Sequence, residues 1–163
     1  MMLNESAFMS NKMDWETPNK LFRKLDNEFS FDVDVCADNQ NKKCDKYFDV
    51  NDDGLSQKWS GVCWMNPPYG REIRHWVEKA YQETVVNGNT EKVVCLVPVR
   101  SDTKWWHDFI MRAKEIRFLN KRLSFEGSSN KAPFSACIVV FCRQNKKTVK
   151  VVVEDISAIN GVT

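Results

Sequence analysis

Four consecutive residues have side chains and spacing suited to holding a planar amine: Asn66, Pro67, Pro68 and Tyr69. They follow the short apolar run 62–65, which predicts a strand buried on both faces, so a loop is expected to start at Asn66. Each proline biases the residue before it away from the helical region and holds the loop extended. The side-chain oxygen of Asn66 and the backbone oxygen of Pro67 can then accept the two hydrogens of an exocyclic amino group, while the Tyr69 ring stacks on the heterocycle. The alternative interpretation is a plain turn, and the position of the loop after a buried strand counts against it.

Such an arrangement suits methyl transfer to the amine nitrogen. An aromatic amine is a poor nucleophile because its lone pair is delocalised, and two fixed acceptors favour both the pyramidal nitrogen and the positive charge that develops during attack. An in-line displacement on a sulfonium methyl needs neither a covalent intermediate nor a metal ion. The sequence agrees, because none of its six cysteines forms a Cys-x-x-Cys pair and only His75 and His107 are available as histidine ligands. We expect reduced, buried thiols and no bound metal.

Hydrophobic periodicity predicts the helices and strands that would position this loop. Apolar stripes at helical spacing predict a helix after Thr17 and Pro18, with the Thr17 hydroxyl as its cap, and further helices at 73–81 and 105–113. Alternating or short apolar runs predict strands at 29–35, 62–65, 93–99, 116–119, 123–125, 134–142 and 148–153. No helix-length pattern separates the last two, so a hairpin is expected across residues 144–146. The sequence therefore predicts an α/β fold of three layers, with a mostly parallel, Rossmann-like sheet and an antiparallel C-terminal hairpin.

Length and apolar content limit the overall organisation. With 163 residues, the chain 1–163 is expected to form a single domain, with 1–13 as a flexible N-terminal segment. No apolar run approaches the roughly 20 residues of a membrane helix. The first fourteen residues lack the apolar core of a signal peptide. We therefore expect a cytoplasmic protein with no membrane partner.

Charges are unevenly distributed, although the net charge is only +2. Residues 26–54 hold nine acids and three bases, whereas residues 112–150 hold ten bases and two acids. This asymmetry is typical of a surface that faces a polyanion, and a solvated basic face without a partner gives the same pattern. Arg71 beside the proline loop, Arg100 at the end of a predicted strand and Arg122 in the basic segment are candidate contacts to the phosphates of such a polyanion.

Several segments together resemble phage-type Dam-like DNA adenine methyltransferases, which use S-adenosylmethionine to methylate the exocyclic amine of adenine. The resemblance spans residues 14–141 and rests on the motifs DWETP (14–18), FDVDVCA (31–37), KCDKYF (43–48), WMNPPYGR (64–71), RSDT (100–103) and APF (132–134). It implies a methyltransferase fold that binds S-adenosylmethionine and acts on double-stranded DNA. The target adenine would be flipped out of the duplex, with Asn66 to Tyr69 as the catalytic residues.

The resemblance also implies where the cofactor binds. Two segments would contact it, namely Trp15, Thr17 and Pro18, which match the segment that closes over its methionine end, and Asp34, Cys36 and Ala37, which match the loop after the first strand. Asp53 matches the carboxylate that accepts from the cofactor adenine amine, with Asp49 and Asp52 as alternatives. Most enzymes of the wider class carry a glycine-rich loop after the first strand, and this chain has no glycine before Gly54. Close approach of the backbone is therefore expected to rely on Cys36 and Ala37.

The length of the chain leaves no separate target-recognition domain, so loops 38–61 and 127–133 are expected to read the DNA sequence. A bacterial or phage-infected host cytoplasm fits the resemblance, and the oligomeric state stays open. Two other functions also fit these motifs. One is a methyltransferase that acts on RNA or on a protein glutamine amide, and the other is a non-catalytic DNA-binding module on the same scaffold.

Overall fold

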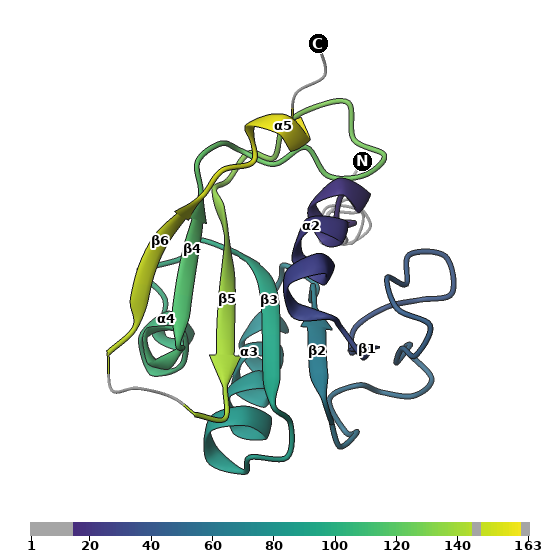
Figure 1. Ribbon diagram of the computed structural model, residues 1–163, viewed down its shortest axis with the longest axis vertical. Coiled ribbons are helices and arrows are strands. Elements are labelled where there is room, and N and C mark those ends of the chain that lie inside the picture. Colours follow the sequence, from purple (N-terminus) through teal and green to yellow (C-terminus); the bar gives the residue numbers. More distant parts are fainter. Residues whose placement is uncertain (1–14, 145–147, 161–163) are drawn as a thin grey trace, which may run out of the picture.

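A computed structural model describes residues 15–144 and 148–160, which form one six-stranded sheet with helices against it (Figure 1). The strands are Val33–Asp34 (β1), Val62–Met65 (β2), Lys92–Pro98 (β3), Glu115–Leu119 (β4), Ala136–Cys142 (β5) and Lys150–Glu154 (β6). They lie in the order β1-β2-β3-β5-β4-β6. β5 is antiparallel to both of its neighbours, and all other neighbouring pairs are parallel. The predicted mostly parallel α/β sheet is confirmed.

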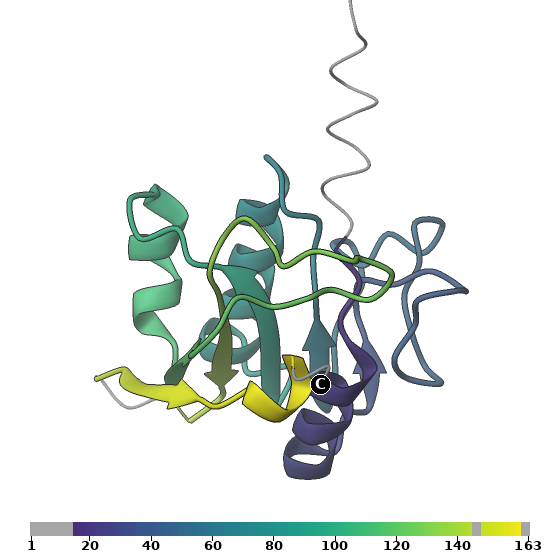
Figure 2. The same ribbon diagram turned by 90° about the horizontal axis from the view of Figure 1, so that it is seen from above.

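Helices cover both faces of this sheet (Figure 2). One face carries Ile73–Tyr81 (α3), its π-helical continuation Gln82–Val86 (η1), Lys104–Asp108 (α4) and the 3-10 turn Ile110–Arg112 (η2). The other face carries Asn19–Phe29 (α2) and Ser157–Asn160 (α5). The three predicted layers are thus confirmed. The segment 1–13, for which we expect flexibility, lies outside the described residues.

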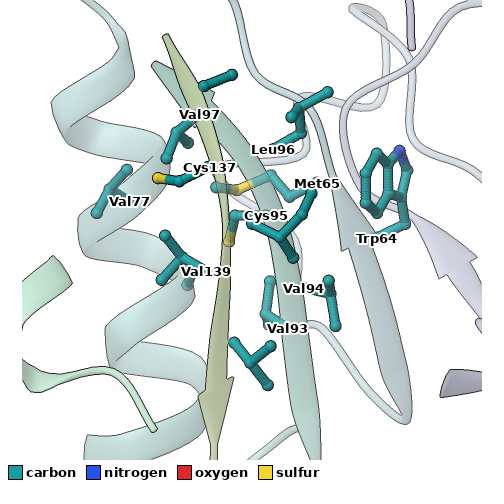
Figure 3. Packing of buried hydrophobic residues seen from close by; sticks show 14 of the residues in the cluster. Trp64, Met65, Val77, Val93, Val94, Cys95, Leu96, Val97, Cys137 and Val139 are labelled. Carbon is teal, nitrogen blue, oxygen red and sulfur yellow. The ribbon is translucent and has the colours of Figure 1, made fainter. Parts of the chain in front are cut away.

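The central strands form the core because helices cover them on both sides. Every residue of β2 and β5 is buried, as is every residue of β3 after Lys92. Continuous apolar runs of this kind are what a strand between two helical layers requires. Figure 3 shows Met65, Cys95 and Cys137 among the packed side chains of the three strands. The cysteines are free thiols, of which Cys63, Cys95, Cys137 and Cys142 are buried, and Cys36 and Cys44 half-buried.

The helix predicted after Pro18 forms, but its start differs from the expectation. Leu21, Phe22 and Leu25 are its buried residues, as the apolar stripe predicts. Pro18 is the N-cap residue, and the N–H of Asn19 in the first turn donates to the Glu126 carboxylate at 3.3 Å, so the capping role expected for Thr17 is wrong. The chain is still extended at Pro18, which directs the Thr17 hydroxyl away from the helix amides. Its hydrogen-bond partner is the side chain of Asn66.

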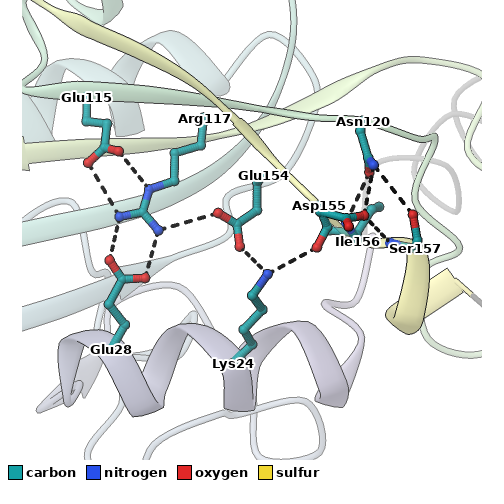
Figure 4. A network of polar contacts seen from close by, with 9 residues as sticks. All are labelled: Lys24, Glu28, Glu115, Arg117, Asn120, Glu154, Asp155, Ile156 and Ser157. Carbon is teal, nitrogen blue, oxygen red and sulfur yellow. Dashed lines mark hydrogen bonds and ion pairs between the residues drawn. The ribbon is translucent and has the colours of Figure 1, made fainter.

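The buried guanidinium of Arg117 connects α2 to the sheet through hydrogen bonds and ion pairs (Figure 4). Arg117 of β4 donates to Glu28 of α2 at 2.7 Å and to Glu115 at 3.1 Å, and lies 3.5 Å from Glu154 of β6. Lys24 of α2 lies 2.6 Å from Glu154 as well. The hydrogen bond to Glu28 and those to Glu115 raise the pKa of Arg117 above its ordinary value, so the group stays charged. A buried cation that is this fully partnered avoids the penalty of an unpaired charge.

The predicted C-terminal hairpin is wrong. β6 pairs in parallel with β4, with Ile116 opposite Val151, and β4 lies between β5 and β6. The two last strands do run in opposite directions, as a hairpin requires, but they are not neighbours. The turn expected at 144–146 lies mostly outside the described residues. Periodicity indicates that both segments are strands, whereas the choice of neighbour depends on pairing across the whole sheet.

Three predicted elements differ from the structure by more than one or two residues at their ends. Only Val33–Asp34 of the predicted strand 29–35 pairs as a strand. The helix predicted at 105–113 ends at Asp108, and η2 follows it. Residues 123–125 form no strand, although Leu123 and Phe125 are buried. In the described ranges, no helix combines the length and the apolarity that crossing a bilayer would require.

Candidate active site

A cavity of about 620 Å³ lies at the carboxyl ends of β1 and β2. Four segments and the Trp76 side chain of α3 line it, the segments being residues 15–17, the chain after β1, residues 48–54, and the proline loop after β2. Ligands of open α/β sheets bind beyond the carboxyl ends of the strands, and the volume is that of a small-molecule site. The predicted site residues in its wall are Trp15, Thr17, Asp34, Cys36, Ala37, Asp53, Asn66, Pro67 and Pro68. Those outside the wall are Pro18, Tyr69, Arg71, Arg100 and Arg122.

The two amide atoms of Asn66 have unlike surroundings. Nδ2 donates to the carbonyl oxygen of Trp15 at 2.6 Å and to the hydroxyl of Thr17 at 2.9 Å. Oδ1 is buried and has no hydrogen-bond partner within residues 15–144 and 148–160. A buried acceptor without a partner destabilises a fold and therefore needs an explanation. Asn66 is one of the residues that line the cavity, so a hydrogen-bond donor bound there would lie close to this oxygen.

Tyr69 lies behind the cavity wall, in a cluster of aromatic rings. Its hydroxyl donates to the carbonyl oxygen of Leu96 in β3 at 2.9 Å. Burial raises the pKa of this hydroxyl well above its ordinary value, which keeps it a donor. The ring packs at steep angles on Phe125 and Phe134, with centroids 6.1 and 5.6 Å away. The ring is thus held in place beside Asn66, and its stacking on a base stays a prediction.

Asp34 is a buried carboxyl in the cavity wall. Its oxygens accept backbone N–H groups from Lys43 at 3.0 Å and from Cys36 at 3.3 Å. Burial raises the pKa of Asp34 to about 7, against the lowering effect of these two hydrogen bonds. The group therefore changes charge near neutral pH, and as a carboxylate it would stabilise a cation in the cavity.

Lys43 contributes to the site, although its residue type alone does not predict this role. Its Nζ lies 2.8 Å from Oδ1 of Asn19 and 3.3 Å from Oε1 of Glu16, and it is almost fully buried. Its backbone N–H donates to Asp34, as described above. Lys43 thereby ties the chain after β1 to the segment that precedes α2. In the sequence it is one cation among several in a charged stretch.

A glycine from a second loop allows close backbone packing beneath the cavity. A β-carbon on Gly54 would lie 2.3 Å from the carbonyl oxygen of Val35 and 3.1 Å from the Trp76 ring. Real β-carbons do not approach backbone atoms this closely, so a glycine is required. Cys36 and Ala37 lie in the cavity wall, and the close approach of their backbone to the cofactor stays a prediction.

The three candidate carboxylates occupy different positions. Asp49 lines the cavity and accepts the N–H groups of Asn51 and Asp52. Asp52 accepts the N–H of Asp49 and is absent from the wall. Asp53 lines the cavity at a left-handed backbone position, φ 53°, and no hydrogen bond to its carboxylate occurs among the described residues. Within residues 15–144 and 148–160, no group of three or more His, Cys, Asp or Glu side chains is placed to hold a metal ion.

The three predicted DNA-contacting arginines lie along one edge of the sheet. Arg71, Arg100 and Arg122 follow the carboxyl ends of β2, β3 and β4, and all three are exposed. Since these strands point the same way, their carboxyl ends share the edge at which the cavity lies. The structure thus places the arginines on the side of the molecule that carries the cavity.

Comparisons with known proteins give a consistent result. The family model described as DNA N-6-adenine-methyltransferase (Dam) matches residues 6–160. A protein of Haemophilus phage HP1 named DNA N-6-adenine-methyltransferase is 34% identical over 129 residues, which cover 77% of this chain and 73% of that protein. A protein of the same name from Escherichia phage T1 is 25% identical over 138 residues, 83% of this chain. The match spans only 56% of the longer T1 protein.

Proposed function

The chain belongs to the DNA N-6-adenine-methyltransferase (Dam) family, and from this premise we propose that it methylates adenine in double-stranded DNA. A methyltransferase requires a methyl donor, and the donor we propose is S-adenosylmethionine. The acceptor is the exocyclic amine of an adenine flipped out of the duplex. The observation that carries the proposal is the buried Oδ1 of Asn66, which has no partner among the described residues and belongs to the wall of a cavity of cofactor size.

The cavity wall suits S-adenosylmethionine in size and chemistry. When bound, S-adenosylmethionine supplies an electrophilic methyl group on a positively charged sulfonium. The Asp34 carboxylate stabilises positive charge in the cavity, and the rings of Phe48 and Trp76 offer apolar surface to a purine. Asp53 is the carboxylate that we assign to the amine of the cofactor adenine, because Asp49 and Asp52 already accept backbone N–H groups.

Asn66 and Pro67 hold the target amine. Oδ1 of Asn66 and the carbonyl oxygen of Pro67 accept one amine hydrogen each, so the nitrogen lone pair points away from them. As the nitrogen becomes tetrahedral and positively charged, both acceptors bind it more strongly than they bind the neutral amine. Both oxygens are fixed before the reaction, so little reorganisation accompanies the developing charge. Neither residue forms a covalent bond to the substrate.

Tyr69 stacks on the target adenine in this proposal, and the loop between β4 and β5 has to give way first. Phe125 and Phe134 of that loop pack on the Tyr69 ring. A base that enters would replace one of these rings, with base–aromatic stacking of about 1–3 kcal/mol in place of the aromatic contact. Residues 127–133 belong to the same loop, which agrees with the role in reading DNA that we propose for them and for 38–61.

Arg71, Arg100 and Arg122 bind DNA phosphates around the cavity. Their shared edge lets a duplex lie across the carboxyl ends of the strands while one base reaches Asn66. Contacts of this kind position a duplex without reading its sequence. Because the relatives named above come from phages, we place the reaction in the cytoplasm of a bacterial host, where phage DNA lies.

The other functions are less well supported. A non-catalytic DNA-binding module has no use for a buried amide oxygen in the cavity wall that lacks a partner in residues 15–144 and 148–160, because such an oxygen would only destabilise it. RNA bases and protein glutamine amides also present planar amines, but both relatives reported above are named for DNA adenine.

Transfer of tritium from methyl-labelled S-adenosylmethionine tests the proposal directly. The protein is incubated in parallel with duplex DNA, with RNA and with a protein mixture that contains release factors. We expect label in DNA alone, recovered as N6-methyladenine after digestion to nucleosides. Label in RNA or protein alone would contradict the substrate. Failure to bind the cofactor in a calorimeter would favour the non-catalytic module.

A further inference from the structure

The segment ahead of α2 binds the catalytic amide directly. Both hydrogens of Asn66 Nδ2 are taken, one by the backbone carbonyl of Trp15 at 2.6 Å and one by the Thr17 hydroxyl at 2.9 Å. These acceptors lie 51 and 49 residues away in sequence. The two hydrogen bonds are therefore tertiary contacts, and the orientation of the Asn66 amide depends on how this segment is held.

The two contacts also fix which amide atom faces the target. A backbone carbonyl can only accept, so the atom 2.6 Å from Trp15 must be the nitrogen of Asn66. A flipped amide would place two acceptors at that distance, which is strongly unfavourable. Oδ1 must then be the atom that has no partner in the described part of the protein. The orientation that a methyl acceptor site needs is thus imposed from outside the catalytic loop.

Donation of both Nδ2 hydrogens also strengthens the oxygen as an acceptor. Hydrogen bonds polarise one another when they form a chain through one group. When its N–H groups donate hydrogen bonds, the amide nitrogen releases more electron density to the carbonyl group. The negative charge on Oδ1 therefore increases, and this favours the hydrogen bond to an amine that becomes positive. The Thr17 hydroxyl supplies one of these two bonds through its side chain, whereas Trp15 contributes through its backbone.

Two further loops hold the segment in place. The carbonyl oxygen of Glu16 accepts the backbone N–H of Glu126 at 2.9 Å, and the Glu16 carboxylate lies 3.3 Å from Lys43 Nζ. Thr17 is itself only 2% exposed. The buried Thr17 hydroxyl is thereby held next to the Asn66 amide, and rotation of that amide would break the hydrogen bond between them.

We propose that Thr17 is a positioning residue, whose hydroxyl locks and polarises the Asn66 amide so that Oδ1 receives the target amine. This inference rests on the proposed function of the site. It differs from the cofactor contact that the resemblance implies, because it acts on the rate of transfer and leaves the affinity for the methyl donor unchanged.

The test compares Thr17→Val, which removes the hydroxyl at nearly constant shape, with Thr17→Ser, which retains it. Thr84→Val is the matched control, because Thr84 is fully buried and its hydroxyl donates to Ala80 in the helical layer away from the site. For Thr17→Val we expect kcat for DNA methylation to fall about tenfold or more, with KM for DNA and Kd for S-adenosylmethionine within about twofold of wild type. Thr17→Ser should recover most of kcat, and Thr84→Val should match the wild type.

A second measurement does not depend on activity. In 15N-resolved NMR spectra, the side-chain NH2 of Asn66, assigned by its absence in Asn66→Ala, should show two shifted, slowly exchanging protons. In Thr17→Val, one of the two should lose its shift and exchange rapidly with water. If Thr17→Val does not fold, Thr17→Ala removes the same hydroxyl without adding a methyl group, and takes its place.

The outcomes separate this inference from the proposed function. Wild-type kcat in a folded Thr17→Val protein, or an unchanged Asn66 amide signal, would overturn the positioning role. A loss of cofactor affinity with unchanged kcat would also overturn it, in favour of a cofactor contact. If the wild-type protein methylates no DNA, the proposed function fails, and the Asn66 signal still decides whether Thr17 holds the amide.

Discussion

Gly54 lies directly against the carbonyl oxygen of Val35, in a gap too small for a β-carbon. The β-carbon of an alanine would be 2.3 Å from that oxygen and 3.1 and 3.3 Å from two atoms of the Trp76 ring. The oxygen belongs to the backbone at the end of β1 and cannot move aside as a flexible side chain could. One of the few glycines of this chain therefore determines how close residues 49–54 lie to the first strand.

Gly54→Ala should destabilise the protein by about 1–3 kcal/mol, the usual range for overpacking a well-filled interior. It should also weaken cofactor binding, because the residues displaced line the cavity. Urea denaturation and calorimetry with S-adenosylmethionine measure the two effects. Gly127→Asn is the control, since Gly127 has φ 73° and open space around it, and asparagine tolerates that conformation. Equal stability of the two variants would contradict the close contact.

The stability of the wild-type protein should depend on pH through Asp34. Burial raises the pKa of this carboxyl to about 7, above its value of 3.8 in an unfolded chain. Between these values the folded state holds a proton that the unfolded state has lost, so the free energy of unfolding falls as pH rises. The shift in the pKa of Asp34 corresponds to about 4 kcal/mol in the free energy of unfolding. The protein has this contribution at low pH and has lost it above pH 7.

Urea denaturation of wild type and Asp34→Asn from pH 4 to pH 8 checks this sign. The wild-type protein should lose stability relative to the variant across that interval, and the difference should become constant above about pH 7.5. Parallel curves would show that Asp34 titrates normally. Saturating S-adenosylmethionine should reduce the loss, because a cation in the cavity favours the carboxylate.

Asn66→Ala should lower kcat for methylation by at least about a hundredfold, as expected when a fixed acceptor of the transition state is removed. Affinity for S-adenosylmethionine should change little, since the remainder of the cavity wall is intact. Single-turnover methylation and calorimetry distinguish the two effects. Asn89→Ala is a matched control, because Asn89 donates to Glu83 at the opposite end of the sheet. Wild-type turnover in Asn66→Ala would refute the assigned role.

Arg71→Ala and Arg100→Ala should each weaken DNA binding and reduce the slope of log affinity against log salt by about one, as the loss of one phosphate contact requires. Fluorescence anisotropy with a labelled duplex at 50 to 200 mM salt would provide the slopes. Arg143 is also exposed but follows β5, whose carboxyl end lies at the opposite edge of the sheet. Arg143→Ala should therefore leave the slope unchanged, and an equal effect of all three variants would argue against the proposed DNA edge.

Local pattern predicted most of the elements, because each is formed largely by its own residues. The four-residue run of β2 and the apolar stripe of α3 match the structure residue for residue. β6 shows where this approach stops. Its run of valines is typical of a strand, but its pairing with β4 rather than β5 is decided by competition among strands far apart in the chain.

The site was predictable in its residue types and less so in its contacts. The proline loop, Asp34 and Cys36 lie in one cavity, as their positions after strands predict. The bond between Thr17 and Asn66 was hidden, because a threonine before a proline is also a sound helix cap. Gly54 is informative only when its neighbour Val35 is known, and that contact spans 19 residues of irregular chain.

The place of β5 in the sheet has a consequence for biosynthesis. β3 and β4 are made first, yet each borders β5, so the sheet stays in two separate pieces until residues 136–142 leave the ribosome. The last strand, β6, can add only to β4, on the far side of that join. The two parts of the hydrophobic centre can therefore join only after β5 has been synthesised, so the sheet as a whole folds after that step.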